Sequence, residues 1–154
     1  MLWIKTFFGI LFQTSLLGIF LYLPALTLNW PDALLFLTIH FLITILASAY
    51  LLIVKPASIE ARMNYDSETQ PKEDRLATVL MLSAIVLGLS LAPIDIFHLN
   101  LSSNFEGNIK NIGLAMYIIG MLFVMASMNA NEFAETTVNI QEERGQKVID
   151  TGIY

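Results

Sequence analysis

The chain has 154 residues, of which 56% are hydrophobic and only 14% are charged. A soluble domain is typically about 45–50% apolar and about 25% charged, so this composition points to lipid, and the length excludes a membrane bundle joined to a separate soluble enzyme domain. A net charge of −5 without a basic run argues against nucleic acid as a partner, and the lack of cysteine excludes disulfides, iron–sulfur clusters and thiolate zinc sites.

The first apolar segment covers residues 3–26 and is interrupted by Lys5 and by a short polar run in its middle. Its uninterrupted part, residues 7–23, is longer than the roughly 7–15 residues of a signal-peptide core, and no clear cleavage site follows it. We therefore expect a retained transmembrane helix.

The second segment, residues 33–54, is the strongest candidate for a membrane span. It holds fourteen Leu, Ile, Phe or Val residues, each of which favours insertion by about 0.3–0.6 kcal/mol at a helix centre. Their sum, on the order of 4–8 kcal/mol, exceeds the roughly 2.5–3.5 kcal/mol that even a full charge at His40 would cost. Two further apolar segments, residues 76–94 and 112–128, complete a set of about four spans.

The basic residues predict the orientation of these spans. The connection between the second and third spans is rich in Lys and Arg, whereas the first connection has none and the third has only Lys110. By the positive-inside rule, both termini and the second connection face the cytoplasm. The basic residues on the cytoplasmic side are Lys5, Lys55, Arg62, Lys72, Arg75, Arg144 and Lys147.

The connections give further expectations. Residues 29–32 read Asn-Trp-Pro-Asp, which predicts a tight turn with Pro31 opening the second helix. We expect Lys55–Arg75 to be a loop, exposed over residues 64–74, and residues 95–107 to lie along the outer interface.

After the fourth span the pattern changes. Residues 136–141 alternate apolar and polar side chains, residues 143–146 supply a turn, and residues 147–154 resume the alternation. The sequence thus predicts an all-α, multi-pass transmembrane bundle over residues 1–128, followed by a short cytoplasmic extended or hairpin tail over residues 129–154.

Few residues in the predicted spans have side chains that could bind a ligand or transfer a proton. His40 is the only ionisable group deep in a span, and it is either a ligand or proton relay or, as the simpler interpretation, a neutral side chain hydrogen-bonded to a neighbouring helix. We expect His98 to be an inert loop residue. Two distant histidines and no cysteine give no basis for a metal site.

The fourth span carries a face of small residues, and a cluster of polar residues lies at its end. The face of small residues predicts close helix packing, with a ligand groove as the alternative. The polar cluster at its end is either a solvated helix terminus or the rim of a cofactor pocket. The small face comprises Gly113, Gly120, Ala126 and Ser127, and the polar cluster comprises Asn129, Asn131, Glu132 and Glu135.

The C-terminal segment carries the most specific pattern. Residues 131–141 read Asn-Glu-Phe-Ala-Glu-Thr-Thr-Val-Asn-Ile-Gln, and residues 145–154 read Gly-Gln-Lys-Val-Ile-Asp-Thr-Gly-Ile-Tyr. This segment closely resembles the cytoplasmic entry to the catalytic region of bacterial isoprenylcysteine carboxyl methyltransferase-like proteins, which are membrane enzymes related to the phospholipid N-methyltransferases. The stretch from Pro56 to Arg62 and the charged cluster at residues 72–75 also resemble that family, so the resemblance covers essentially the whole chain.

The resemblance implies S-adenosylmethionine-dependent methyl transfer to a lipid-linked carboxylate or amine. Gly152 and Tyr154 align with the entry to the cofactor loop, where they either contribute to the cofactor site or only shape the loop; no catalytic residue is indicated. In the family an Arg-His-Pro-x-Tyr segment, further helices and two glutamates follow and hold most of the cofactor site. The sequence stops at Tyr154, so we expect the N-terminal two-thirds of such an enzyme, inactive and unable to bind S-adenosylmethionine appreciably by itself.

An alternative is a non-enzymatic membrane scaffold, or a remnant bundle that packs with a partner subunit supplying the missing helices. In either case the lipid bilayer is the main partner. A transporter is disfavoured, because the spans contain no paired charge network.

Overall fold

Four long helices run through the part of the chain that the structure describes. The structure is a computed structural model, and it describes residues 1–63, 72–101 and 107–131. A helix of 23 or 24 residues is about 35 Å long, which is enough to cross a hydrocarbon core about 30 Å thick. The long helices are α1 (Leu2–Ala25), α2 (Pro31–Val54), α4 (Lys72–Ile94) and α5 (Gly107–Ala130); a short helix, α3 (Pro56–Met63), follows α2, and a π-helical turn, η1 (Asp95–Leu99), follows α4.

All four long helices are apolar enough to span a membrane. The prediction of an all-α bundle with about four spans is therefore confirmed, and the protein is an integral membrane protein. The hairpin or extended tail was predicted over residues 129–154; residues 129 and 130 belong to the last turn of α5, and residues 132–154 lie outside the described residues.

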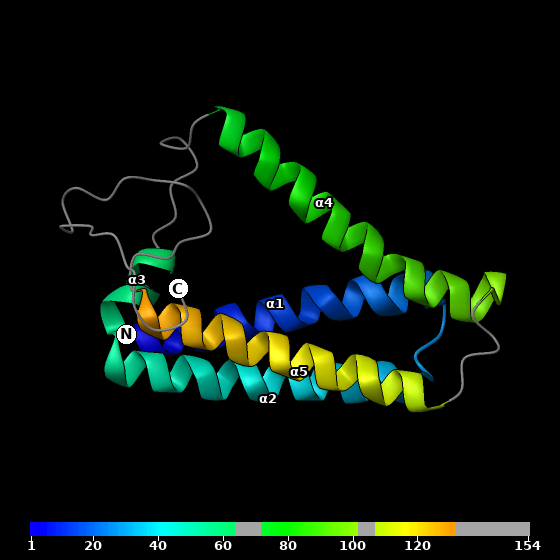
Figure 1. The fold of residues 1–154 in the computed structure, drawn as a ribbon, viewed down its shortest axis with the longest axis horizontal. Coiled ribbons are helices and arrows are strands. Elements are labelled where there is room, and N and C mark those ends of the chain that lie inside the picture. Colours follow the sequence, from blue (N-terminus) through cyan, green and yellow to red (C-terminus); the bar gives the residue numbers. More distant parts are fainter. Residues whose placement is uncertain (64–71, 102–106, 132–154) are drawn as a thin grey trace.

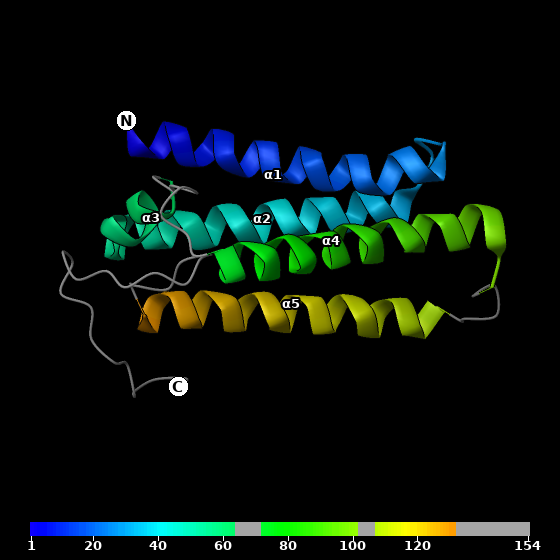
Figure 2. The same ribbon diagram turned by 90° about the horizontal axis from the view of Figure 1, so that it is seen from above.

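Helix α2 lies between α1 and α5, and the three helices run roughly side by side (Figures 1 and 2). Helix α4 packs against α1 through its C-terminal half and diverges from the other helices toward its N-terminal end (Figure 1). Two hydrogen bonds hold the packed half: the Ser90 hydroxyl donates to the Phe20 carbonyl at 3.5 Å, and His98 Nε2 donates to the Pro24 carbonyl at 2.8 Å.

Most of the apolar side chains point outward rather than into a core. Only seven hydrophobic side chains are buried among the described residues, whereas exposed Leu, Ile, Phe and Met side chains cover all four long helices. A helix that is hydrophobic all round belongs either inside a large protein or in a membrane. A chain of this size cannot cover these surfaces itself, so lipid must do so.

The end of α1 and the start of α2 lie on either side of the predicted turn. Leu26 adopts a left-handed conformation with φ of 55°, and its backbone N–H donates to the Tyr22 carbonyl, which closes the last turn of α1. Pro31 then occupies the first turn of α2 and Asp32 follows it, as the sequence predicted. Proline lacks the N–H that would be left unpaired there, and the Asp32 carboxylate is favoured near the positive end of the helix dipole.

The loop predicted over Lys55–Arg75 is wrong for the described part of that range. Residues 56–63 form α3, and α4 already begins at Lys72. Helix α3 forms because Ser58 and Ile59 are buried against the ends of the neighbouring helices, where Ile59 packs with Leu51 and Leu52. The chain therefore has a folded cap at this end instead of an open connection.

The expectation that residues 95–107 form an interfacial loop also needs correction. The first part of this stretch is the π-helical η1, whose wider turn ends where the Asn100 N–H donates to the Asp95 carbonyl at 2.7 Å. The Asp95 side chain then accepts a hydrogen bond from the Leu101 N–H at 2.7 Å. The Asp95 carboxylate thus stabilises the helix end that the pattern of apolar residues had placed one turn earlier.

Close packing of the fourth predicted span through its glycines is not found among the described residues. A Cβ atom added at Gly113 or at Gly120 would meet nothing within 4 Å. The main neighbour of α5 is α2, and the glycines do not bring another described helix against it.

The buried contact between α2 and α3 predicts that shortening a buried leucine of α2 destabilises the protein more than shortening an exposed one. Leu51→Ala is expected to lower the free energy of unfolding by about 2–4 kcal/mol, because Leu51 is 1% exposed and its loss leaves a cavity beneath α3. Leu46→Ala, at a 69% exposed position on the same helix, is expected to cost less than about 0.5 kcal/mol. Unfolding by sodium dodecyl sulfate in mixed micelles measures both, and equal losses would contradict the assigned core.

Candidate functional site

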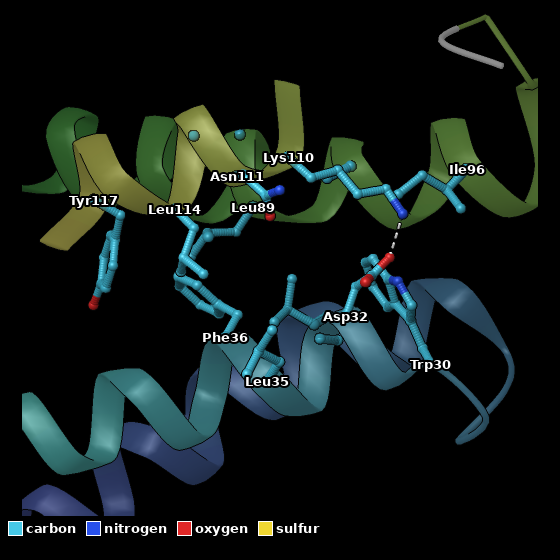
Figure 3. Close-up of a pocket in the computed structure, with 15 residues that line it drawn as sticks. Trp30, Asp32, Leu35, Phe36, Leu89, Ile96, Lys110, Asn111, Leu114 and Tyr117 are labelled. Atoms are coloured by element: carbon cyan, nitrogen blue, oxygen red, sulfur yellow. Dashed lines mark hydrogen bonds and ion pairs between the residues drawn. The ribbon is translucent and has the colours of Figure 1, made fainter. Parts of the chain in front are cut away.

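A pocket of about 450 Å³ opens between α2, α4 and α5 near the end of the bundle where α2 and α5 begin (Figure 3). Its walls are mainly apolar. They are formed by Leu35 and Phe36 of α2, Leu89 and Ala92 of α4, and Leu114 and Tyr117 of α5. Because these side chains come from three separate helices, the pocket exists only in the folded bundle.

Charged and aromatic side chains surround the mouth of the pocket. Lys110 Nζ lies 2.5 Å from Asp32 Oδ2, and the two side chains are 63% and 55% exposed. Trp30 lies beside them and contacts the ring of Phe97 edge to face at 5.3 Å. Tryptophan is favoured at membrane interfaces, so we expect the mouth to lie at the level where lipid head groups meet the hydrocarbon.

Tyr117 lines the pocket, and its hydroxyl is paired with His40, which does not line it. His40 Nδ1 is 2.5 Å from the Tyr117 hydroxyl, and the ring of Phe36 packs against both side chains. His40 is 4% exposed. Of the two interpretations of His40, the structure matches the hydrogen bond to a neighbouring helix; its Nε2 has no partner among the described residues.

His98 is not the inert loop residue that was expected. It lies in η1 and donates a hydrogen bond from Nε2 to the Pro24 carbonyl, 2.8 Å away. The last carbonyls of a helix have no partner within that helix, so the imidazole satisfies one of them and fastens η1 to α1. No local pattern could have predicted this contact, since the two residues are 74 positions apart.

The opposite end of the bundle holds a second polar cluster. Arg62 Nη1, at the end of α3, lies 3.0 Å from the sulfur of Met128 in the last turns of α5. The Tyr50 hydroxyl donates to Asn129 Oδ1 at 3.4 Å, which ties α2 to the same part of α5. Helix α3 therefore covers the end of the bundle from which the chain continues into residues 132–154.

Only part of the sequence-predicted site lies within the described residues. Asn129 is hydrogen-bonded to α2 as above, and the Asn131 N–H donates to the Ser127 carbonyl at 2.8 Å. Glu132 and Glu135, and the candidate cofactor-binding residues Gly152 and Tyr154, lie outside the described residues. The two interpretations of the polar cluster therefore stay predictions.

No family model, curated protein or solved structure matches this chain. The chemistry of its two polar ends therefore has to be argued from the residues themselves. One end offers an arginine and amide groups beside a short interfacial helix, and the other offers an apolar pocket with an ion pair at its mouth.

The buried His40–Tyr117 pair predicts a stability effect. Tyr117→Phe is expected to cost about 1–2 kcal/mol of unfolding free energy, because it leaves His40 Nδ1 buried without its partner. Tyr50→Phe removes a longer, exposed hydrogen bond to Asn129 and serves as the matched control, with an expected cost below about 0.5 kcal/mol.

A double-mutant cycle with His40→Phe tests the pairing directly. The double variant should be less destabilised than the sum of the two single variants, because the second substitution removes a group that the first left unpaired. Strict additivity would show that the two side chains are not coupled.

Proposed function

We propose that this protein forms part of a membrane methyltransferase. The enzyme would transfer the methyl group of S-adenosylmethionine to a lipid-linked carboxylate or amine. The observation that carries the proposal is the contact between Arg62 and Met128, 3.0 Å apart. The stretch ending at Arg62 resembles this class, and Met128 lies three residues before the segment beginning at Asn131, which carries the most specific part of the resemblance. The contact brings α3 to the part of α5 from which that segment starts, and this supports a shared site at this end of the bundle.

The reaction suits a site at the edge of the bilayer. The methyl carbon leaves the sulfonium sulfur as its bond to the acceptor oxygen or nitrogen forms, and the sulfur keeps the electron pair as a neutral thioether. A carboxylate attacks directly, whereas an ammonium group must first lose a proton. Such a displacement depends on alignment and on the exclusion of water. A helical cap at the membrane surface can provide both for an acceptor whose lipid tail stays in the bilayer.

Arg62 is the residue of this end best suited to hold an anionic acceptor. Its guanidinium is always charged and presents planar pairs of N–H donors that match a carboxylate. It lies on α3, which is fixed by the buried side chains of Ser58 and Ile59. This placement favours a carboxylate over an amine as the methyl acceptor.

We further propose that the α3 end of the bundle faces the cytoplasm of a bacterial inner membrane. The start of α1, the end of α2 and α3 lie at one end of the bundle, and the start of α5 lies at the other (Figure 1). Lys5, Lys55 and Arg62 belong to the first set of segments, whereas Lys110 lies in the first turn of α5. The donor molecule is made in the cytoplasm, so this orientation would bring it to the end where the C-terminal segment leaves α5.

A non-enzymatic bundle that packs with a partner subunit is the second candidate. It is supported by α5, whose spanning part contains no buried residue and whose Gly113 and Gly120 are open to close approach. A partner helix could pack there in place of lipid.

The proposed orientation can be measured with single cysteines, because the natural chain has none. In intact cells of the host, a membrane-impermeant maleimide is expected to label Asn29→Cys, in the exposed connection between α1 and α2. Glu60→Cys, exposed on α3, should react only after the cells are opened. The reverse pattern would place the α3 end outside the cytoplasm.

Methyl transfer can be tested in membranes of the host, where any partner subunit is present. Expression of the protein in a deletion strain is expected to raise the tritium that passes from S-adenosyl-[methyl-³H]methionine into the lipid extract or into lipid-modified protein. Arg62→Met should lower this rate by about 10- to 100-fold, since a charge-assisted hydrogen bond contributes about 1.5–3 kcal/mol.

Lys5→Met is the matched control, because it removes one positive charge from the same end without touching α3. Its rate should stay within about twofold of the unchanged protein. Equal labelling of membranes with and without the protein would overturn the proposed activity and favour the partner-packing bundle.

A further inference from the structure

We propose that the pocket between α2, α4 and α5 binds a zwitterionic phospholipid, with one acyl chain inside the pocket and the head group held by Asp32 and Lys110. This site is distinct from the proposed methyl-transfer site. It lies where α2 and α5 begin, whereas Arg62 and Met128 meet at the other end of these helices. A resident lipid here is independent of any catalytic activity of the chain.

The size of the pocket suits an acyl chain. Its volume of about 450 Å³ lies within the range of about 300–1,000 Å³ that is usual for small-ligand pockets. An acyl chain is narrow enough to lie in a channel between helices, and the walls of this pocket are mainly apolar.

Small residues keep this space open. Gly88 of α4 and Gly113 of α5 both line the pocket, and a Cβ atom built on either would meet nothing within 4 Å. Glycine in a helix interior costs about 1 kcal/mol relative to alanine. Neither glycine is needed for helix contact in the described structure, so the room they leave in the pocket is their evident effect.

The floor of the pocket suits the end of an alkyl chain. Lys110 and Tyr117 are seven residues apart on α5, so the pocket extends about 10 Å from the ion pair toward the membrane centre. The Tyr117 hydroxyl is already hydrogen-bonded to His40. Phe36 and Tyr117 line the pocket with aromatic carbon atoms, and these favour an apolar group over a polar one.

The mouth of the pocket carries both signs of charge. Asp32 and Lys110 are paired with each other, yet each is more than half exposed (Figure 3). Asn111 follows on the same helix and makes no hydrogen bond to the described residues, and its amide projects into the space between the helices. An anionic head group would meet the Asp32 carboxylate beside the Lys110 ammonium, whereas a head group with an ammonium and a phosphate can pair with both.

The preference of a lipid for this pocket over the surrounding bilayer must come from head-group contacts and from packing. An acyl chain gains no hydrophobic free energy by moving from the bilayer into an apolar pocket, since lipid tails are as apolar as the pocket walls. Blocking the channel or removing the charges should therefore each weaken binding.

The test uses the full chain, stripped of lipid in detergent, with bound phosphatidylethanolamine counted by native mass spectrometry during a titration. The unchanged protein is expected to bind one molecule more tightly than any others. Gly113→Leu should weaken this site at least fivefold, because its side chain fills the channel. Gly120→Leu is the matched control: it lies at an equally open position of α5 that does not line the pocket, and its affinity should stay within twofold.

Gly88→Leu on the opposite wall gives a second, independent block, and circular dichroism verifies that each variant keeps its helices. Asp32→Asn and Lys110→Met should each weaken binding about two- to fivefold, the range expected for exposed charge pairs. Retention of the lipid by both Gly113→Leu and Gly88→Leu would overturn the site. Equal affinity for phosphatidylglycerol would overturn the head-group assignment, and a dimer lost in Gly113→Leu would identify a second copy of the chain as the occupant instead.

Discussion

The absence of water in the bilayer core is the constraint on which this structure depends. Every backbone polar group must find a partner inside its own segment, so the chain forms helices wherever it is in lipid. The same medium removes the usual reason for helices to associate, because burying a leucine against another helix gains little over burying it in lipid. The bundle therefore depends on a small number of specific contacts. They include the α3 cap over Leu51, the His40–Tyr117 pair, and the hydrogen bonds from Ser90 and His98 to α1.

These contacts divide the molecule into two chemically different ends. At one end, α3 closes the bundle with buried aliphatic side chains and brings Arg62 against α5. At the other end, α4 and α5 leave a pocket whose mouth carries Asp32 and Lys110. The proposed methyl acceptor and the proposed phospholipid would make different demands on the protein, and each proposal rests on a different end of the bundle.

The sequence predicted the parts of the fold that depend on local composition. The four spans follow from uninterrupted apolar runs, and the start of α2 follows from Pro31 and Asp32. The pairing of Asp32 with Lys110 could not be predicted, because the two residues are 78 positions apart. Their contact depends on how α2 and α5 are rotated about their own axes. Helix α3 was missed because eight residues of mixed polarity give no clear period. Gly113 and Gly120 misled the prediction, since small residues allow close packing but do not require it.

Helix α4 has a mechanical consequence that follows from the position of its attachments. Ser90 and His98 fasten it to α1 near one end, while its first turns lie away from the bundle (Figure 1). A helix of 23 residues is about 34 Å long, and its N-terminal half, about 17 Å, extends beyond the part that packs on α1. A rotation of about 10° about the packed part would move the first turn of α4 by about 3 Å. A change in the packing around Gly88 would therefore be felt where α4 begins.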